Sequence, residues 1–408
     1  MDALIGNAVR NRGSPRYCKK NGVPNMPLRN REGRGFDDTS SQETCLFCPC
    51  MAFSVGRRVI SLHVYQTLCR AQGVFLDYKT FLWQGKATTV ERWKMANKSE
   101  EIIAEVKKVI IGKDDVIEKT LMAILAGGHV LLEDVPGVGK TTLALSFART
   151  LGLDYQRIQC TPDTTPSDII GYSFYQKGAS DLVYKPGVVM CNLLLADEIN
   201  RTSSKTQSAL LEVMEEGNVT VDGVTRPLPD PFTVIATQNP FGSAGTQLLP
   251  QSQLDRFAIR LHMGYPDFDS HVDILRDRNI SQPLDSVNQV ASMEDIKKMR
   301  AEVEAVNVRD ELFVYIAKLS ESTREVEDIS LGLSPRGSIA VVRMAKAKAY
   351  VSGRSYLVPQ DIVDIFPDVA SHRLILSPKA KIAGINVNGI IEKLIRENKT
   401  PEIMPTDS

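Results

Sequence analysis

Short apolar runs alternate with polar, glycine-containing turns in much of the chain after residue 95, and this pattern predicts an α/β fold. Three runs have the length and branched side chains of buried strands. They are residues 129–134, 192–197 and 232–237. Residues 142–149 follow the first run with helical spacing. The three runs therefore predict neighbouring strands of a parallel sheet flanked by helices.

The pattern changes after Asp267, where apolar residues recur with helical spacing. Ser292 and Asp295 are spaced as a capping box, which predicts a helix start. Further helices are expected near residues 309–324, 336–352 and 359–372. We therefore predict a smaller all-α lid domain at the C-terminal end.

Two segments have the pattern of β-hairpins inserted between the larger elements. Residues 171–186 alternate aromatic and polar side chains around a glycine-containing turn. Residues 218–226 centre on Asp222-Gly223, which suits a two-residue type I′ turn. The pattern alone leaves two interpretations open, contact with a partner or surface decoration, since long surface loops are tolerated without function.

The first 94 residues show no sustained period of 2 or 3.6, and we expect them to be poorly ordered. We therefore predict an N-terminal extension at 1–94, a nucleotide-binding α/β domain at 95–267, and a lid domain with a tail at 268–408. Met95 precedes Ser99 and two acidic residues, a pattern that predicts a capped helix start. Our hypothesis is that the functional chain begins near Met95 and that the extension is not native.

The same extension holds the cysteines Cys45, Cys48 and Cys50, whose spacing invites comparison with zinc sites. A second ligand pair should follow, but His63 and Cys69 are six residues apart, outside the usual spacing. We therefore favour a segment without a metal site.

Charge is balanced over the whole chain, with 49 basic and 49 acidic residues, but it is unevenly distributed. Residues 1–94 have 15 basic and 7 acidic side chains, so residues 95–408 have 34 and 42. The acidic excess makes nucleic acid an unlikely partner, because phosphate contacts dominate such binding. No apolar run reaches the roughly 18 residues of a membrane span, and a signal-peptide core is missing, so we expect a cytoplasmic protein.

A glycine-containing turn lies between the first predicted strand and its helix. Such a turn aims backbone N–H groups and the positive end of the helix dipole at one point, which suits a polyphosphate. Lys140 would reach the β- and γ-phosphates, and the Thr141 hydroxyl would bind Mg²⁺. The candidate phosphate-binding residues are Pro136, Gly137, Val138, Gly139, Lys140, Thr141 and Thr142. Asp134 stands where the strict P-loop pattern has glycine, and its side chain can point away from the phosphates.

Polar side chains end the other two predicted strands. Asp197 and Glu198 follow one of them, so Asp197 can hold the metal ion and Glu198 can polarise the attacking water as a general base. Asn239 or Thr237 at the end of the other strand would orient that water. Two later arginines, Arg256 and Arg336, are candidates to stabilise charge on a γ-phosphate in the transition state.

The order of these motifs resembles the Walker A, Walker B, sensor 1, arginine finger and sensor 2 series of AAA+ ATPases. The segments LLADEINRTSSKTQSALLEVMEEGNVTVDG and PDPFTVIATQNP resemble the MoxR family in particular. The resemblance covers about residues 97–380. It implies an ATP-hydrolysing, chaperone-like enzyme that remodels or matures a client protein or complex, with a von Willebrand factor A domain protein as a partner.

The same resemblance implies roles for single residues. Asn239 would be sensor 1, Arg256 would act on the neighbouring subunit's nucleotide, and Arg336 would act on its own. Ile111 and Gly112 would line the adenine base. Because an arginine finger needs a neighbour, the resemblance also implies a homo-oligomer, a hexameric ring with ATP and Mg²⁺ at the subunit interfaces.

Other functions fit the sequence less well. A chelatase-like or DNA-directed AAA+ motor of the same clade is the alternative. A GTPase is disfavoured because Asp168 and Gly171 spell D-x-x-G but no guanine motif follows. A scaffold that only binds nucleotide is disfavoured because Glu198, Asn239 and Arg256 are all present.

Overall fold

The computed structural model describes residues 98–177, 182–239, 249–280 and 283–401. The predicted extension at 1–94, its clustered cysteines and the proposed start at Met95 lie outside these residues.

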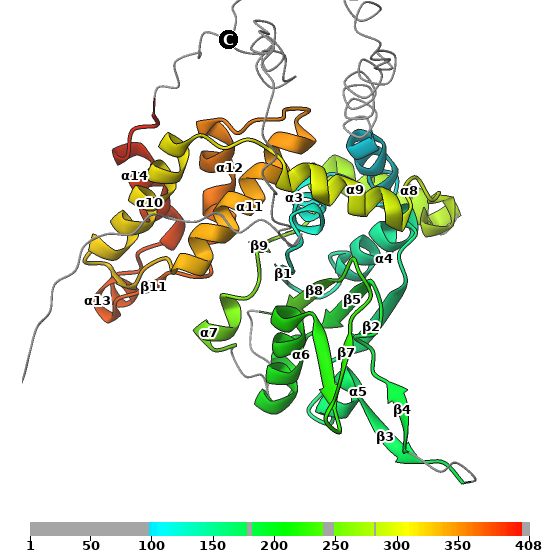
Figure 1. Cartoon of the computed structure of the whole chain (residues 1–408). Helices are drawn as coiled ribbons and strands as arrows, with labels where there is room; N and C mark the ends of the chain where they lie inside the picture. The colour runs from blue at the N-terminus through cyan, green and yellow to red at the C-terminus, as the bar shows by residue number, and fades with distance from the viewer. Residues whose placement is uncertain (1–97, 178–181, 240–248, 281–282, 402–408) are drawn as a thin grey trace, which may run out of the picture. The chain divides into compact units, whose positions relative to one another are not determined.

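Five parallel strands form the central sheet in the order β2-β5-β8-β1-β9 (Figure 1). Their bounds are β1 Val130–Glu133, β2 Tyr155–Gln159, β5 Leu193–Asp197, β8 Thr233–Gln238 and β9 Ile259–Leu261. The three strands predicted from the apolar runs are β1, β5 and β8, and the sheet places them side by side. The prediction of a parallel α/β sheet is confirmed.

Alternate residues of each central strand enter two different cores, one on each face of the sheet. In β1, Val130 and Leu132 pack into one core while Leu131 packs into the other. Side chains of successive strand residues point to opposite faces, so a strand buried on both faces needs a continuous apolar run. The helices that contribute to the first core include α3 Asp114–Leu125 and α4 Lys140–Leu151, and those of the second are α5 Pro166–Ile170 and α6 Ser204–Glu216.

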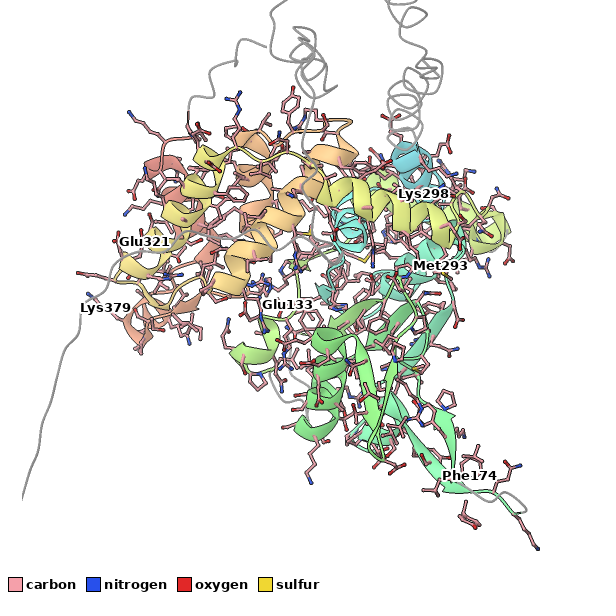
Figure 2. The ribbon with its side chains drawn as sticks, viewed as in Figure 1. Glu133, Phe174, Met293, Lys298, Glu321 and Lys379 are labelled. Carbon is pink, nitrogen blue, oxygen red and sulfur yellow. The ribbon has the colours of Figure 1, made fainter. Side chains whose placement is uncertain are left out.

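Both predicted hairpins are present. The first pairs β3 Gly171–Tyr175 with β4 Leu182–Pro186, and the second pairs β6 Asn218–Val221 with β7 Val224–Pro227. Asp222 and Gly223 have φ angles of 52° and 75°, as a type I′ turn requires. Figure 2 shows Phe174 on the β3–β4 hairpin, well away from Glu133 at the end of β1.

The chain after β9 is mainly helical. Its elements are α8 Phe268–Ile280, η3 Pro283–Ser286, α9 Met293–Glu304, α10 Asp310–Glu325, β10 Ile329–Leu331, α11 Pro335–Val351, α12 Pro359–Ala370, β11 Ile375–Leu376, α13 Pro378–Ile382 and α14 Val387–Glu397. Ser292 and Asp295 form the predicted capping box at the start of α9. The pattern did not reveal the short antiparallel pair of β10 and β11, because strands of two or three residues leave no periodic signal.

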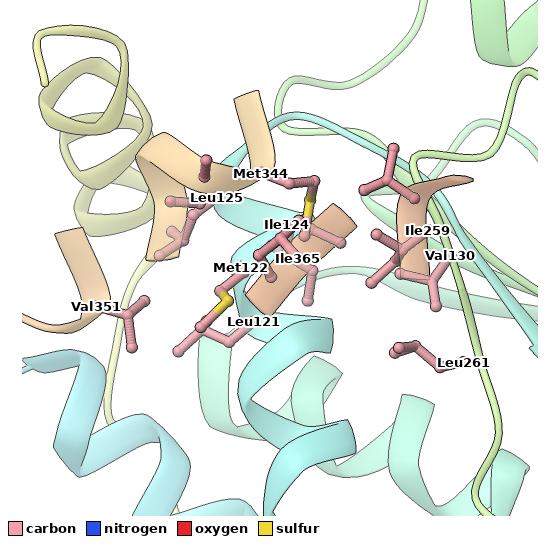
Figure 3. Packing of buried hydrophobic residues seen from close by; sticks show 14 of the residues in the cluster. Leu121, Met122, Ile124, Leu125, Val130, Ile259, Leu261, Met344, Val351 and Ile365 are labelled. Carbon is pink, nitrogen blue, oxygen red and sulfur yellow. The ribbon is translucent and has the colours of Figure 1, made fainter. Parts of the chain in front are cut away.

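One apolar core joins α3 to the helices near the C-terminal end (Figure 3). Leu121 and Met122 of α3 pack in the same cluster as Met344 of α11 and Ile365 of α12. All four side chains are fully buried. Burying such a side chain stabilises the fold by about 1.5–3 kcal/mol. This core supports the helices that follow the sheet.

The prediction that Ser99 caps the first helix is wrong. Lys98 is already helical, and the helix continues through residue 107. Ser99 lies inside this helix and its side chain is fully buried, so it cannot supply the non-helical cap residue.

Candidate functional site

A turn at residues 134–139 connects β1 to α4. Gly137 and Gly139 have φ angles of 86° and 95°, in the left-handed region that glycine adopts without steric cost. Helix α4 begins at Lys140, and the first turn contains no acidic side chain. The N–H groups and dipole of a helix start attract anions. The structure therefore gives the predicted residues, Pro136 through Thr142, the strand–turn–helix geometry of a phosphate-binding loop.

Lys140 is the candidate phosphate ligand, and its ammonium group is half-buried beside three acidic residues. Its Nζ donates a hydrogen bond to the backbone oxygen of Asp134 over 2.7 Å. Burial lowers the pKa of Lys140, while the charges of Asp134, Asp197 and Glu198 act in the opposite direction. The predicted Walker A lysine and Walker B acids are thus close enough to interact electrostatically.

The ends of β1, β5 and β8 explain why these groups meet. β5 and β8 pair with Ala196 opposite Ala236, and β1 and β8 pair with Glu133 opposite Gln238. Because the three strands are parallel and adjacent, their carboxyl ends reach the same edge of the sheet. Ligands in open parallel sheets bind at this edge.

Thr237 links the two acids that end β5. Its Oγ1 donates to Asp197 Oδ1 over 2.6 Å, and it accepts a hydrogen bond from the backbone N–H of Glu198 over 2.8 Å. Glu198 has a φ of 55°, which is unusual for a residue with a side chain. The Thr237 hydroxyl therefore fixes both the Asp197 carboxylate and the turn that carries Glu198.

The acids have further partners that sequence analysis missed. Arg157 of β2 donates to Asp197 Oδ2 over 2.7 Å. Gln159 and Arg201 donate to Glu198 Oε2 over 3.0 and 2.8 Å. A single arginine or glutamine has no sequence signal for such a contact. Strand pairing of β2 with β5 brings Arg157 and Gln159 there.

Asn239, the predicted sensor 1 residue, comes directly after β8. Its backbone oxygen accepts a hydrogen bond from Asn200 Nδ2 over 3.2 Å. Asn200 belongs to the short helix η2 Ile199–Arg201, which begins directly after Glu198. This contact holds the segments that follow β5 and β8 together at the same edge of the sheet.

Ile111 and Gly112, the predicted adenine-side residues, lie beside the start of α8. Gly112 has a φ of 71°, and an added Cβ would collide with the Ser270 hydroxyl. Lys113 donates to the backbone oxygen of Tyr265 over 2.8 Å. The predicted base-side segment therefore packs against the connection between β9 and α8.

Arg256 and Arg336 meet on one carboxylate. Arg256 Nε lies 3.0 Å from Glu215 Oε2, an ion pair in which the N–H does not point at the oxygen. Arg336, in the first turn of α11, donates to Glu215 Oε1. Within the described residues, neither arginine contacts Lys140, Asp197 or Glu198. Sequence analysis missed Glu215, because one glutamate in the charged end of a helix carries no signal.

A buried arginine fixes the segment that carries Arg256. Arg373 Nε donates to Asp255 Oδ1 over 2.7 Å, and its Nη2 donates to the backbone oxygen of Phe257 over 2.5 Å. Arg373 is only 3% exposed. The chain that follows α12 thus holds the predicted finger motif in place.

The oxygen ligands at the predicted metal site fit Mg²⁺. Thr141 is the second residue of α4 and Asp197 ends β5, so a hydroxyl and a carboxylate are available. Mg²⁺ is bound by few protein oxygens together with water and substrate phosphates. Among the described residues, no three His, Cys, Asp or Glu side chains cluster as a metal site. None of the helices in the described parts of the chain is long and apolar enough to span a membrane.

Two family models match the chain. Residues 129–259 match the model described as ATPase family associated with various cellular activities (AAA). Residues 321–394 match the AAA lid domain. The first match contains the phosphate-binding loop, the two acids of β5 and Asn239, and the second contains Arg336.

Known relatives cover most of the chain. The uncharacterized protein YeaC of Bacillus subtilis (strain 168) is 46% identical over 299 residues, which are 73% of this chain and 93% of the relative. Chaperone MoxR1 of Mycobacterium tuberculosis is 39% identical over 314 residues, 74% of this chain and 82% of that protein. A solved structure of a protein from Cytophaga hutchinsonii is 38% identical with a TM-score of 0.74, and the match covers 78% of this chain and 100% of that one.

Proposed function

Because this chain belongs to the MoxR family of AAA+ ATPases, we propose that its ATP hydrolysis drives the remodelling or maturation of a client protein or complex. The observation that carries the proposal is the meeting of Lys140, Asp197, Glu198 and Thr237 at one edge of the sheet. The relative named Chaperone MoxR1 supports a protein client.

Each residue at this edge has a step in hydrolysis that suits its chemistry. Lys140 and the N–H groups at the start of α4 bind the phosphates. Glu198 accepts a proton as water attacks the γ-phosphorus and the bond to the bridging oxygen of ADP breaks. Asn239 orients the water. Thr237 fixes the Asp197 carboxylate and the backbone of Glu198 relative to each other.

Thr141 and Asp197 would hold Mg²⁺. The bound ion supplies positive charge near the phosphate oxygens, where negative charge develops. The Asp197 carboxylate accepts hydrogen bonds from Thr237 and Arg157. An ion at Asp197 would therefore compete with the Arg157 guanidinium for one carboxylate oxygen.

The arginines support a ring-shaped homo-oligomer, which we propose to be hexameric. Arg256 acts on the neighbouring subunit's nucleotide and Arg336 on its own subunit's. Both arginines are paired with Glu215, so an arginine that binds a γ-phosphate would exchange this carboxylate for the phosphate.

The β3–β4 hairpin supports contact with a client or partner. Tyr175 and Leu182 near its tip are 69% and 57% exposed, and Phe174 is 39% exposed. Exposed apolar side chains that cluster on one hairpin mark an interaction surface. A von Willebrand factor A domain protein is the partner that we propose for this family member.

The test uses a subunit trapped with ATP. Tagged Glu198→Gln protein with ATP should retain a von Willebrand factor A domain protein from the native source, and should release it when ATP is replaced by ADP. Lys140→Ala protein is the matched control, because it cannot bind the nucleotide. Equal retention by both variants would show that client binding does not depend on the ATP state and would refute the proposal.

A further inference from the structure

Asp134 occupies the first position of the phosphate-binding loop, where glycine is the expected residue. Its side chain is 8% exposed. Its Oδ1 and Oδ2 accept the backbone N–H of Gly264 over 3.1 and 3.2 Å, and Oδ2 also accepts the N–H of Met263. The carboxylate therefore binds the backbone of residues 262–267, the connection between β9 and α8.

This connection lies against the phosphate-binding loop at several points. His262 Nδ1 is 2.7 Å from the backbone oxygen of Glu133. A Cβ added to Gly139 would lie 3.8 Å from Met263 Cε. The contacts reach both the start and the end of the loop, so they fix the position of the connection relative to the loop.

The far end of the connection reaches the predicted adenine-side segment. Asp267 accepts hydrogen bonds from the backbone N–H and the hydroxyl of Ser270 over 2.8 and 2.9 Å. Ser270 in turn packs so closely on Gly112 that no Cβ would fit there. Lys113 also donates to the backbone oxygen of Tyr265, halfway along the connection.

We propose that Asp134 is a positioning residue for the nucleotide base: it anchors residues 262–267, which in turn place Ile111 and Gly112. This inference rests on the proposed ATP site, with the base at Ile111 and Gly112. A hydrogen bond to a carboxylate is stronger than one to a neutral acceptor. Without Asp134, the N–H groups of Met263 and Gly264 lose their acceptor and the connection is no longer fixed.

The phosphate side should not need this carboxylate. Lys140 contacts the backbone oxygen of Asp134, which every residue at this position would supply. Removing the carboxylate also removes a negative charge close to Lys140. Recognition of the base therefore depends on the Asp134 side chain, whereas binding of the phosphates does not.

The experiment compares equilibrium binding of ATP with that of inorganic tripolyphosphate, which lacks the base. The wild-type protein should bind ATP more tightly. In Asp134→Gly the ratio of the two affinities should fall about tenfold, the scale of losing a hydrogen bond to a charged group. Tripolyphosphate should bind the variant at least as well as the wild type. Asp134→Asn keeps one acceptor and should show a smaller fall in the ratio.

Glu392→Gln is the control for charge, because it removes one negative charge from an exposed residue of α14, outside both residues 262–267 and the phosphate-binding loop. Its affinity ratio should equal that of the wild type. An unchanged ratio in both Asp134 variants, or an equal loss of both ligands, would overturn the inference. If Asp134→Gly does not fold, Asp134→Asn decides the matter alone. A wild-type protein that binds neither ligand would instead refute the proposed function.

Discussion

The Thr237 hydroxyl donates a hydrogen bond to the Asp197 carboxylate over 2.6 Å and so joins the ends of β8 and β5. The same oxygen accepts the Glu198 N–H. One side chain thereby aligns a predicted metal ligand with the predicted general base, although the three residues come from two separate segments of the chain.

Thr237→Ala should lower ATP turnover about tenfold to a hundredfold, because small misplacements of reacting groups have effects of this size. The free energy of unfolding should fall by about 1 kcal/mol, since the partly buried Glu198 N–H loses its acceptor. Steady-state ATPase assays and denaturant unfolding measure the two effects. Thr237→Ser keeps the hydroxyl and should retain most of the activity. Equal turnover in the two variants would contradict the role of the hydroxyl.

Glu198→Gln should bind ATP but hydrolyse it at least about tenfold more slowly, because an amide cannot accept the proton of the attacking water. Gln keeps an oxygen for Gln159 and Arg201, so the surrounding contacts should survive. Binding of a fluorescent ATP analogue and single-turnover hydrolysis separate the two properties. Lys140→Ala is the contrasting variant and should fail at binding. Wild-type turnover in Glu198→Gln would exclude this residue as the base.

Arg256→Ala should bind ATP normally and yet lose activity in the assembled protein, because an arginine at a γ-phosphate contributes roughly 10³ to 10⁵ in rate. Mixing it with Lys140→Ala subunits should restore part of the activity. Each mixed interface can then combine an intact phosphate-binding loop with an intact arginine. ATPase assays on mixtures of varied ratio measure the recovery.

The control for this mixture is the double variant Lys140→Ala, Arg256→Ala. It differs from Lys140→Ala only in lacking Arg256, so mixing it with Arg256→Ala subunits should restore no ATPase activity. Recovery with the double variant, or none with Lys140→Ala, would show that Arg256 does not act across an interface.

The free energy of unfolding should decrease as the pH is lowered from 6.5 to about 4, because His129 is buried as a neutral ring. Burial lowers the pKa of His129 to about 4, from an unfolded value near 6.5. The unfolded chain therefore binds a proton first, and the stability present above pH 6.5 is lost as the pH falls towards 4. Nδ1 accepts the Val234 N–H over 3.0 Å, so the neutral ring donates from Nε2 to the Met214 carbonyl. His372, whose pKa is also lowered by burial, adds to the same trend.

Denaturant unfolding at pH 7 and pH 5 measures this dependence. His129→Gln should be less stable at pH 7, because it cannot make both hydrogen bonds. Its free energy of unfolding should change less than the wild type's between the two pH values. An identical pH slope in the two proteins would mean that His129 does not titrate as inferred.

Local sequence patterns predicted the strand ends and the turn that carry the site residues. The apolar runs that end in Asp197 and Thr237 located β5 and β8, and the turn before Lys140 located the start of α4. Asp222-Gly223 predicted its turn because only a few residue pairs accept two positive φ angles.

Contacts between single charged residues could not be predicted in this way. Arg157 and Glu215 reach the site through strand pairing and helix packing, and neither belongs to a recognisable spacing. Asp134 departed from the P-loop pattern, but only the folded chain shows its carboxylate bound to the connection after β9. Ser99 failed as a cap because the helix extends further towards the N-terminus than its polar pattern suggested.

The hydrogen bonds from Arg373 to Asp255 and to the backbone of Phe257 would matter in an assembly of several copies of this chain. In the proposed ring, the arginine that a subunit would offer to its neighbour lies on a segment held by Arg373, which follows α12 of the same subunit. Replacing Arg373 would remove this support without changing any residue of the phosphate-binding loop. In the proposed ring, such a subunit would leave the adjoining active site without a firmly held arginine.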